Sequence, residues 1–358
     1  MVKIKSIKPI AGSAIDTNTA SEIFDQIALF AGYGFNKSHA AAYASVSFQT
    51  AYLRTHHPEC YFAAAMNLEL DDVKEIAPFA SELKARNIML WAPDVNMSTD
   101  IFRPIHLRRA RQRRDFAVSY ALTAMRGVGR QAARDIVAER AARGRFESVK
   151  DFMSRMGAKV NRKAALALVH AGAFDSISNN RADAAAEVDG SKKTLVAEGQ
   201  MSMFDLIPEL DTSEVHQEYD LDDKLDREFD VLGHYLSDHP LRLLRQSIFD
   251  NNQYFSKTIL DPRRDPPRTA HMPAVVCDVD VRQTKKGDTM AVITLSDPDR
   301  TYEALAFKET WAEIKPMMRK KARLLLTMTV IAEGDERRLL VEDAKGLIEA
   351  GKQVSLAA

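Results

Sequence analysis

The sequence predicts a multidomain α+β protein, in which a mainly helical N-terminal part is followed by a linker and a five-stranded β-barrel. Apolar residues recur at helical spacing from about residue 19 to residue 177. A polar and acidic stretch without useful periodicity follows at 178–225. Alternating apolar and polar residues then predict strands within 271–348. A chain of 358 residues has room for several such domains.

The composition is typical of a soluble globular protein, with 46% hydrophobic and 28% charged residues. No apolar run approaches the roughly 18 residues that a membrane helix requires. The N-terminal apolar stretch is too short and too polar for a signal peptide. We therefore expect a cytoplasmic protein without membrane contact. Cys60 and Cys277 lie far apart and outside any Cys/His spacing pattern, which predicts buried, reduced thiols and neither a disulfide nor a zinc site.

The segment at 19–114 is expected to be helical, after an unassigned segment at 1–18. The runs SEIFDQIALFAGYGF, HAAAYASVSFQTAYLRTHH and PECYFAAAMNLEL place apolar residues at helical spacing, with a break at His57-Pro58. VKEIAPFASELKARNIML adds another amphipathic helix. The basic run RRARQRRD at 108–115 does not suit a packed core, so we expect it to be exposed.

Residues 115–177 contain two short helical pairs with glycines at the bends, which predicts a tandem helix-hairpin-helix domain. The first turn is Gly-Val-Gly at 127–129, with Ala132 and Ile136 at packing positions after it. Glycine lets the backbone approach a phosphate, and the N–H groups that open the next helix point toward that phosphate. A merely structural hairpin is the alternative. The DNA-binding residues predicted here are Arg126, Gly127, Val128, Gly129, Arg130 and Arg134.

The formal net charge is zero, but the charges are unevenly distributed along the chain. Residues 101–170 carry 17 Lys and Arg against five Asp and Glu. Residues 205–230 carry eleven Asp and Glu against two basic residues. A basic block of this size indicates an anionic polymer as partner, bound through sequence-independent and salt-dependent contacts. A solvated helix face is the alternative explanation.

A linker with partial order at most is expected at 178–225, followed by a helical connector at 226–270. The linker contains EGQMSMFDLIP, in which apolar residues lie between a polar run and an acidic run. This stretch is too short to bury its own side chains, so it either docks back on its own domain or is held out for a partner. A partner pocket suits it, because Met203 and Phe204 can fill an apolar cleft while Gln200 bonds at the edge.

The last domain is expected at 271–348, before a tail at 349–358. Its strands are predicted at 274–284, 290–297, 302–308, 323–332 and 337–343, with a helix at 309–320. This is the element order of the five-stranded Greek-key OB barrel, a fold that can stack bases on aromatic side chains. The aromatic candidates, which suit a core equally well, are Tyr302, Phe307 and Trp311. The candidates for phosphate contact are Lys285 and Lys286.

No catalytic residue is predicted. The nine histidines form no H-x-H or H-E-x-x-H pair, and neither a G-x-x-x-x-G-K-S/T loop nor a G-x-S-x-G elbow is present. Two-metal phosphoryl transfer requires clustered carboxylates. The pairs Asp71-Asp72, Asp222-Asp223 and Asp297-x-Asp299 are better explained as solvated surface. The chain itself is therefore expected to bind no metal or other cofactor.

The order of these motifs resembles the C-terminal half of the bacterial replicative DNA polymerase III alpha subunit. GYGFNKSHAAAYASVSFQTAYLRTHHPECYFAA is similar to the end of its fingers region. APDVN, ALTAMRGVGRQAARDIV, VNRKAALALVHAGAFDSI, GQMSMFDL, LGHYLSDHP and the OB barrel resemble consecutive parts of that family. The resemblance covers about residues 19–348. It implies a role in DNA replication, with primer-template and single-stranded DNA as partners.

The resemblance also implies roles for individual residues. Those similar to residues that face the sugar and triphosphate of the incoming nucleotide are Tyr33, Lys37, Ser38 and His39. Asn36 or Ser38 would equally serve as an ordinary helix cap. The stretch similar to the pentapeptide that binds the ring-shaped sliding clamp is Gln200, Met201, Ser202, Met203 and Phe204. Packing of Met203 and Phe204 on the chain's own barrel is the alternative.

The chain also departs from the family pattern. An intact member has a histidine-rich phosphoesterase-like domain and a palm with metal-binding aspartates, which use Mg²⁺, and neither is recognised in this sequence. We therefore expect a fragment that binds DNA and the sliding clamp and is inactive alone. The alternative is a DNA-directed DNA polymerase that is active only when combined with a palm-bearing chain.

Overall fold

A computed structural model describes residues 16–31, 37–106, 116–197, 216–242, 254–284, 287–334, 336–350 and 353–356. It divides the chain into two units, Met1–His57 and Pro58–Ala358. The basic run at 108–115 and the predicted clamp peptide lie outside the described residues. Among the residues that are described, no helix is both long and apolar enough to cross a membrane.

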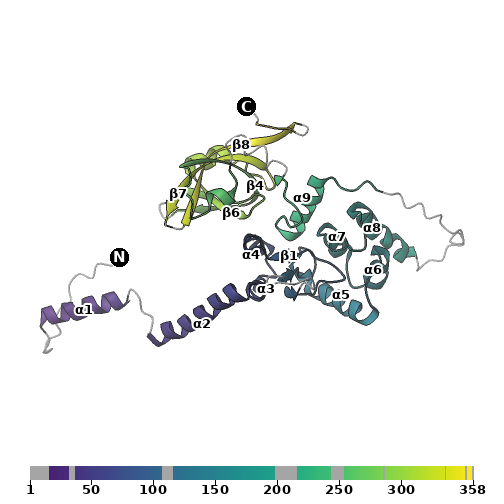
Figure 1. The fold of residues 1–358 in the computed structure, drawn as a ribbon, viewed down its shortest axis with the longest axis horizontal. Coiled ribbons are helices and arrows are strands. Elements are labelled where there is room, and N and C mark those ends of the chain that lie inside the picture. The colour runs from purple at the N-terminus through teal and green to yellow at the C-terminus, as the bar shows by residue number, and fades with distance from the viewer. Residues whose placement is uncertain are drawn as a thin grey trace. The chain divides into compact units, whose positions relative to one another are not determined.

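The described part of the first unit consists of the helices α1 (Thr17–Ala31) and α2 (Lys37–His56) (Figure 1). α2 has no Asp, Glu, Lys or Arg between Ser38 and Leu53. Its large apolar side chains point to more than one side of the helix and are exposed. They are Tyr43, Val46, Phe48, Tyr52 and Leu53. Helices with this surface are normally covered by other protein.

The second unit begins with a helical module, residues 58–232 (Figure 1). Its elements are α3 (Pro58–Leu68), α4 (Val73–Ala85), β1 (Met89–Trp91), β2 (Arg103–His106), β3 (Phe116–Ser119), η1 (Leu122–Ala124), α5 (Arg130–Arg143), α6 (Val149–Met156), α7 (Arg162–His170), α8 (Arg181–Ala197) and α9 (Leu221–Leu232). One hydrophobic core runs through the module and joins side chains as distant in sequence as Phe62 and Leu232.

A small sheet with the strand order β1-β3-β2 lies in this module. β1 is parallel to β3 and pairs Trp91 with Ser119, while β2 is antiparallel to β3. The expectation of an all-helical segment at 19–114 is therefore wrong, and a domain boundary after residue 114 would cut the sheet. Strands of three or four residues were missed because they are too short to show a period of two.

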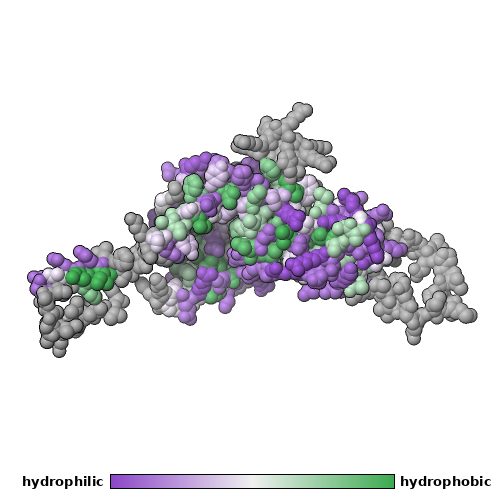
Figure 2. Space-filling view, turned by 90° about the horizontal axis from the view of Figure 1, so that it is seen from below, coloured by the Kyte–Doolittle hydropathy of each residue, from purple (hydrophilic) through white to green (hydrophobic). Residues whose placement is uncertain are grey.

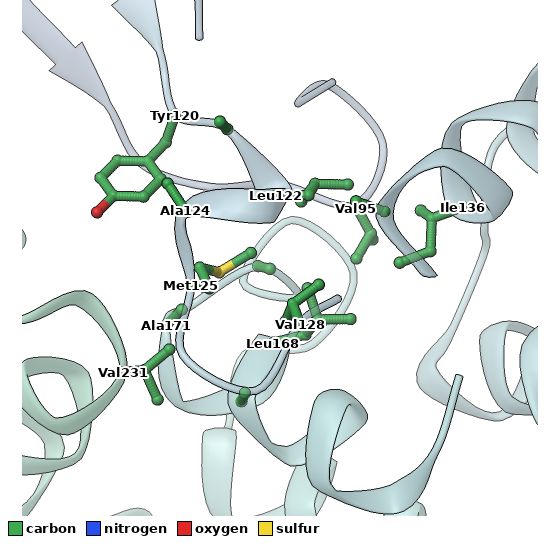
Figure 3. Close-up of a cluster of buried hydrophobic side chains, with 14 of the residues drawn as sticks. Val95, Tyr120, Leu122, Ala124, Met125, Val128, Ile136, Leu168, Ala171 and Val231 are labelled. Atoms are coloured by element: carbon green, nitrogen blue, oxygen red, sulfur yellow. The ribbon is translucent and has the colours of Figure 1, made fainter. Parts of the chain in front are cut away.

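The core beside the first hairpin joins residues from η1, the hairpin, α7 and α9 (Figure 3). Leu122, Met125 and Val128 lie there against Leu168 and Val231, and each of the five is at most 6% exposed. Full burial of side chains of this size stabilises a fold by roughly 1.5–3 kcal/mol each. The hairpin is therefore fixed to the module by its own apolar residues.

The first part of the predicted linker is a helix, α8 (Arg181–Ala197), so the expectation of a linker from 178 onward is wrong. Ala182, Ala184, Ala185 and Val188 are buried, and three of the four belong to the module's core. They recur at three- and four-residue spacing, but alanine contributes little hydrophobicity. The helical period was therefore too weak to recognise in the sequence.

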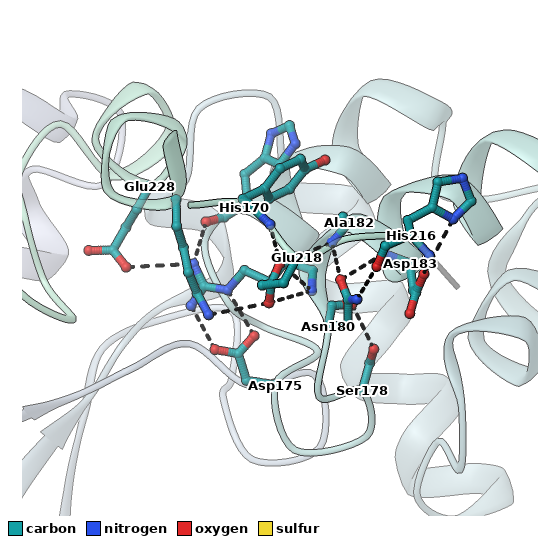
Figure 4. Close-up of polar contacts among 12 residues, drawn as sticks. His170, Asp175, Ser178, Asn180, Ala182, Asp183, His216, Glu218 and Glu228 are labelled. Carbon is teal, nitrogen blue, oxygen red and sulfur yellow. Dashed lines mark hydrogen bonds and ion pairs between the residues drawn. The ribbon is translucent and has the colours of Figure 1, made fainter. Parts of the chain in front are cut away.

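A cluster of polar contacts, which includes the labelled residues Asp175, Asn180 and Glu218 in Figure 4, fixes the start of α8. The Arg181 guanidinium donates to both carboxylate oxygens of Asp175, at 2.9 and 2.6 Å, and to the carbonyl of His170 at 3.0 Å. The Glu218 carboxylate accepts from the backbone N–H groups of Arg181 and Ala182. Residues on both sides of the interval 198–215 are thereby joined at the N-terminal end of α8.

The C-terminal part of the second unit is a barrel. Its elements are α11 (Ser256–Ile259), β4 (Thr269–Gln283), β5 (Thr289–Ser296), β6 (Thr301–Phe307), α12 (Lys308–Ile314), β7 (Arg323–Glu333), β8 (Glu336–Ala350) and β9 (Gln353–Leu356). The strand order is β6-β5-β4-β7-β8-β9, and a parallel pairing of β6 with β8 closes a five-stranded barrel. The predicted OB-type order of three strands, a helix and two strands is confirmed.

Two expectations about single residues are wrong. Cys277 is buried as expected, but Cys60 is exposed. Asp297, expected at the surface, is only 3% exposed, because its carboxylate accepts the N–H and hydroxyl groups of Ser256 and the N–H groups of Asp299 and Arg300. Asp297 therefore organises the turn between β5 and β6.

The helical module contacts this same turn of the barrel. Lys84 on α4 donates to the carbonyl of Pro298 at 2.6 Å. His239, seven residues after α9, bonds through Nε2 to the Ser296 hydroxyl at 3.1 Å, while its Nδ1 accepts from the Leu241 N–H. Nε2 must then carry the proton and donate it. The Ser–His pair is thus an interface contact and lacks the free basic nitrogen that a nucleophilic serine requires.

His239 should contribute to a loss of stability in mild acid. Burial, reinforced by the positive charges of Lys84 and Arg323, lowers the pKa of His239 to about 3. The unfolded chain binds this proton below a pKa of about 6.5, so this contribution is complete above that pH and is lost as the pH falls toward 3. Between pH 7.5 and 5 the unfolding free energy of the wild type should therefore decrease by up to roughly 2 kcal/mol more than that of His239→Gln, as measured by urea denaturation.

The matched control is His271→Gln, which changes an exposed histidine of β4. This variant should retain the acid sensitivity of the wild type. If both variants lose stability equally steeply with falling pH, His239 is not the source.

Candidate nucleic-acid interface

The first hairpin is held by a buried residue between two exposed glycines. Val128 is 5% exposed, and its N–H donates to the carbonyl of Met125 at 3.0 Å. Gly127 has a φ of +93°, a conformation that residues with a Cβ rarely adopt. Gly129, with a φ of −74° and a ψ of 154°, is extended. The sequence therefore requires glycine at 127 for the turn, whereas at 129 the backbone would accept other residues.

The N-terminus of α5 lacks the side-chain cap seen at other helices of the module. α4, α6, α7 and α9 each begin with a side-chain oxygen bound to a backbone N–H, from the residues Asp72, Ser148, Asn161 and Asp220. At α5 the N-cap residue is Gly129, and no side chain in the described part of the chain caps the helix. An added Cβ on Gly129 would meet no atom within 4 Å. The positive end of the α5 dipole is therefore accessible to an anion.

The predicted arginines surround this helix start, but two of them already have carboxylate partners. Arg130 forms a bidentate pair with Asp71, at 2.6 and 3.3 Å. Arg134, one turn further along α5, lies 3.5 Å from a carboxylate oxygen of Asp100. The first pair is exposed and the second is partly exposed, and pairs at the surface contribute little to stability. An anionic ligand can replace these carboxylates at small cost.

Arg126 differs from the other two arginines. Its guanidinium donates to the carbonyl of Asp230 at 3.0 Å, and its backbone N–H donates to the carbonyl of Val231 at 3.0 Å. It forms no ion pair with a residue that the structure describes. A hollow of about 340 Å³ lies beside it, between the hairpin at 125–130 and the turn at 70–74.

Lys163 is a residue of this face that the sequence did not predict. It is exposed at the start of α7, and its aliphatic stem lies 3.7 Å from the position that a Cβ on Gly127 would take. The stem thus passes directly beside the first hairpin, although the residue belongs to the second. Its sequence neighbours gave no signal for this proximity, which depends on the packing of α7 against η1 and the hairpin.

The second hairpin, between α6 and α7, is not equivalent to the first. The Asn161 side chain accepts from the N–H of Ala164 at 2.9 Å and so occupies the position in which a phosphate would bind at α7. Arg162 is paired with Asp189 on α8 through two bonds of 2.7 and 2.9 Å. The open helix start on this face of the module is therefore that of α5.

The barrel residues proposed from the sequence fall into different environments. Tyr302 and Trp311 are 7% and 8% exposed and belong to the core, so they are unsuited to base stacking. Phe307 is 48% exposed and borders a hollow of about 650 Å³ together with Thr284 and Lys308. Lys285 and Lys286 lie outside the described residues.

The residues predicted to face a nucleotide are described only in part. Ser38 and His39 are exposed in the first turn of α2, and the His39 ring lies 4.4 Å from that of Tyr43. Tyr33 and the side chain of Lys37 lie outside the described residues. The same holds for the whole pentapeptide Gln200, Met201, Ser202, Met203 and Phe204. Within the described residues, no group of three or more His, Cys, Asp or Glu could hold a metal ion.

The hairpins and the barrel define a class of protein. Residues 87–184 match the helix-hairpin-helix motif family, which confirms the tandem hairpin domain and extends it upstream to β1 and β2. The chain therefore contains a helix-hairpin-helix domain followed by an OB-type barrel. Among solved structures, the second OB-fold domain of replication protein A from Methanococcus maripaludis is 13% identical over 24% of this chain and 89% of that one. Its TM-score of 0.19 is too low to support an argument.

Comparison with curated proteins identifies the particular relatives. DNA polymerase III subunit alpha of Caulobacter vibrioides is 32% identical over 98% of this chain and 31% of the relative. The same subunit of Neisseria meningitidis serogroup B is 32% identical over 97% of this chain and 30% of the relative. That of Bacillus subtilis is 32% identical over 86% of this chain and 27% of the relative. The resemblance is confirmed: the chain is homologous over nearly its whole length to part of DNA polymerase III subunit alpha. It spans less than a third of those relatives.

Proposed function

We propose that the chain acts in DNA replication and binds the DNA backbone through the first hairpin. The observation that carries the proposal is the uncapped N-terminus of α5 behind Gly127 and Gly129. Its N–H groups, its dipole and the neighbouring Arg126 and Lys163 all favour a phosphate and offer no means of reading a base. The homology to DNA polymerase III subunit alpha supports duplex primer-template DNA as the ligand.

Gly129→Ala should weaken duplex binding while leaving the fold intact. The new methyl group fits the folded chain, because nothing lies within 4 Å of it and the φ of −74° suits alanine. It would stand where a phosphate approaches the α5 N–H groups. We expect a primer-template duplex to bind roughly tenfold more weakly, as measured by fluorescence anisotropy. A change of this size corresponds to the loss of about one charge-assisted hydrogen bond.

The same substitution at Gly190, an exposed position of α8, is the matched control and should leave the affinity unchanged. Gly127→Ala is less informative, because the φ of +93° would also strain the hairpin. Equal affinity of wild type and Gly129→Ala, at equal melting temperature, would show that the hairpin is structural only.

We further propose that the segment 200–204 binds the sliding clamp. Its position in the chain supports this: Ala197 ends α8, and His216 is bonded back to Asp183 near the start of that helix. The interval between them is thus attached to the module on both sides. Burial of Met203 and Phe204 in a partner pocket offers roughly 3–5 kcal/mol, so the isolated peptide should bind at about micromolar strength.

Replacing Gln200, Met203 and Phe204 together by alanine should abolish binding to the ring-shaped clamp, measured by surface plasmon resonance with the full chain. The melting temperature should barely move, because these side chains are proposed to lie outside the core. A large loss of stability with clamp binding retained would show instead that the segment packs on its own domain.

The exposed surface of α2 favours a second role, as part of a polymerase assembled with a palm-bearing chain. Apolar side chains such as Phe48, 71% exposed, and Tyr43, 60% exposed, are suited to burial against such a chain. In that assembly Tyr33, Lys37, Ser38 and His39 would face the incoming nucleotide. The palm would hold the Mg²⁺ ions that activate the primer hydroxyl.

The purified chain should not extend a primer in the presence of Mg²⁺ and nucleotides, whereas addition of a palm-bearing chain should restore extension. Phe48→Asp should block this complementation without affecting duplex binding, since it places a charge in the proposed contact. Extension by the chain alone would contradict the proposal that the catalytic aspartates come from elsewhere.

A further inference from the structure

Lys163, Arg126 and Lys320 are cations from different parts of the second unit. Lys163 lies in the first turn of α7, Arg126 lies in the first hairpin just before Gly127, and Lys320 lies in the turn between α12 and β7 of the barrel. None of the three forms an ion pair with a residue that the structure describes. Their charges are therefore available to an external anion.

A chain of contacts joins these residues into one row, which we call the cationic row. At one end, the stem of Lys163 lies beside Gly127, the neighbour of Arg126. At the other end, the Lys320 ammonium lies 5.2 Å from the centre of the Phe229 ring. Phe229 directly precedes Asp230, whose carbonyl accepts the guanidinium of Arg126. The end of α9 thus holds Arg126 and Lys320 next to one another.

The acidic residues nearby are already engaged. The Asp230 carboxylate pairs with Lys321 at 2.8 Å, and Asp278 on β4 pairs with Lys74 at 2.7 Å. Burial is the main cause that lowers the pKa of Lys320, and the positive charge of Arg126 is the second cause. The row is therefore a place where like charges are crowded, and a polyanion laid across it would relieve their repulsion.

We propose that the DNA-binding surface of this protein is composite and continues from the first hairpin, across the end of α9, onto the α12–β7 turn of the barrel. The partner is the phosphate backbone of duplex DNA, which supplies successive charges along one strand. The barrel then contributes to duplex binding through Lys320. This inference rests on the proposed function of the hairpin.

The test measures duplex affinity at several salt concentrations for Lys320→Gln and Lys163→Gln. Each substitution keeps most of the aliphatic stem and removes the charge. Each should weaken binding about three- to tenfold and reduce the slope of log K against log salt by about one, as expected for one lost phosphate contact. Lys320→Arg, which keeps the charge, should bind like the wild type.

Lys345→Gln is the matched control, because it removes an exposed charge from β8 of the same barrel. If Lys320→Gln has the affinity and salt slope of Lys345→Gln while Gly129→Ala still weakens binding, the composite surface is wrong and the hairpin proposal stands. If Lys320→Arg binds as weakly as Lys320→Gln at an unchanged melting temperature, the charge is not what matters, and the inference also fails. If the wild type does not bind duplex DNA, both proposals fail.

Discussion

The burial of Val128 between two exposed glycines is the constraint on which the candidate interface depends. Its side chain packs into the module's core, and Gly127 can follow the turn only because it has no Cβ. With Val128 fixed, the first turn of α5 is presented to solvent without a capping side chain. The same few residues therefore close the core on one side and leave backbone N–H groups accessible on the other.

α9 determines how the barrel lies relative to this hairpin. Its last turn accepts both hydrogen bonds of Arg126, and its carboxylates pair with the barrel at Lys321 and Arg323, each at 2.8 Å. Partly exposed ion pairs of this kind contribute modestly to stability, but they fix orientation. The buried contact of His239 with Ser296 strengthens the same connection. The helical module and the barrel thus share one connecting element.

The contacts around Arg181 have a different consequence. They hold the residues that follow the interval 198–215 against the start of α8, while Ala197 ends the same helix. A segment attached at both ends loses less conformational entropy on binding than a free tail does. An interaction peptide in this interval would therefore lose less conformational entropy when it binds a partner, because the fold already restrains both of its ends.

Local sequence patterns are sufficient to predict the barrel and the first hairpin. Strands of seven or more residues are long enough to show a period of two, which is clearest in β6, and the spacing of Gly127 and Gly129 before a helix is a local property. Local patterns did not reveal the small sheet, whose strands are too short, or α8, whose buried face is mostly alanine.

Which charges lie next to one another depends on the packing of whole elements. That packing paired Arg130 with Asp71, placed Lys163 beside the first hairpin and brought Lys320 of the barrel next to Arg126. Each of these contacts joins segments far apart in sequence, and exposed Lys and Arg side chains leave no periodic signal of their neighbours. The position of a charge in space depends on how whole elements pack, and that information is absent from the local sequence.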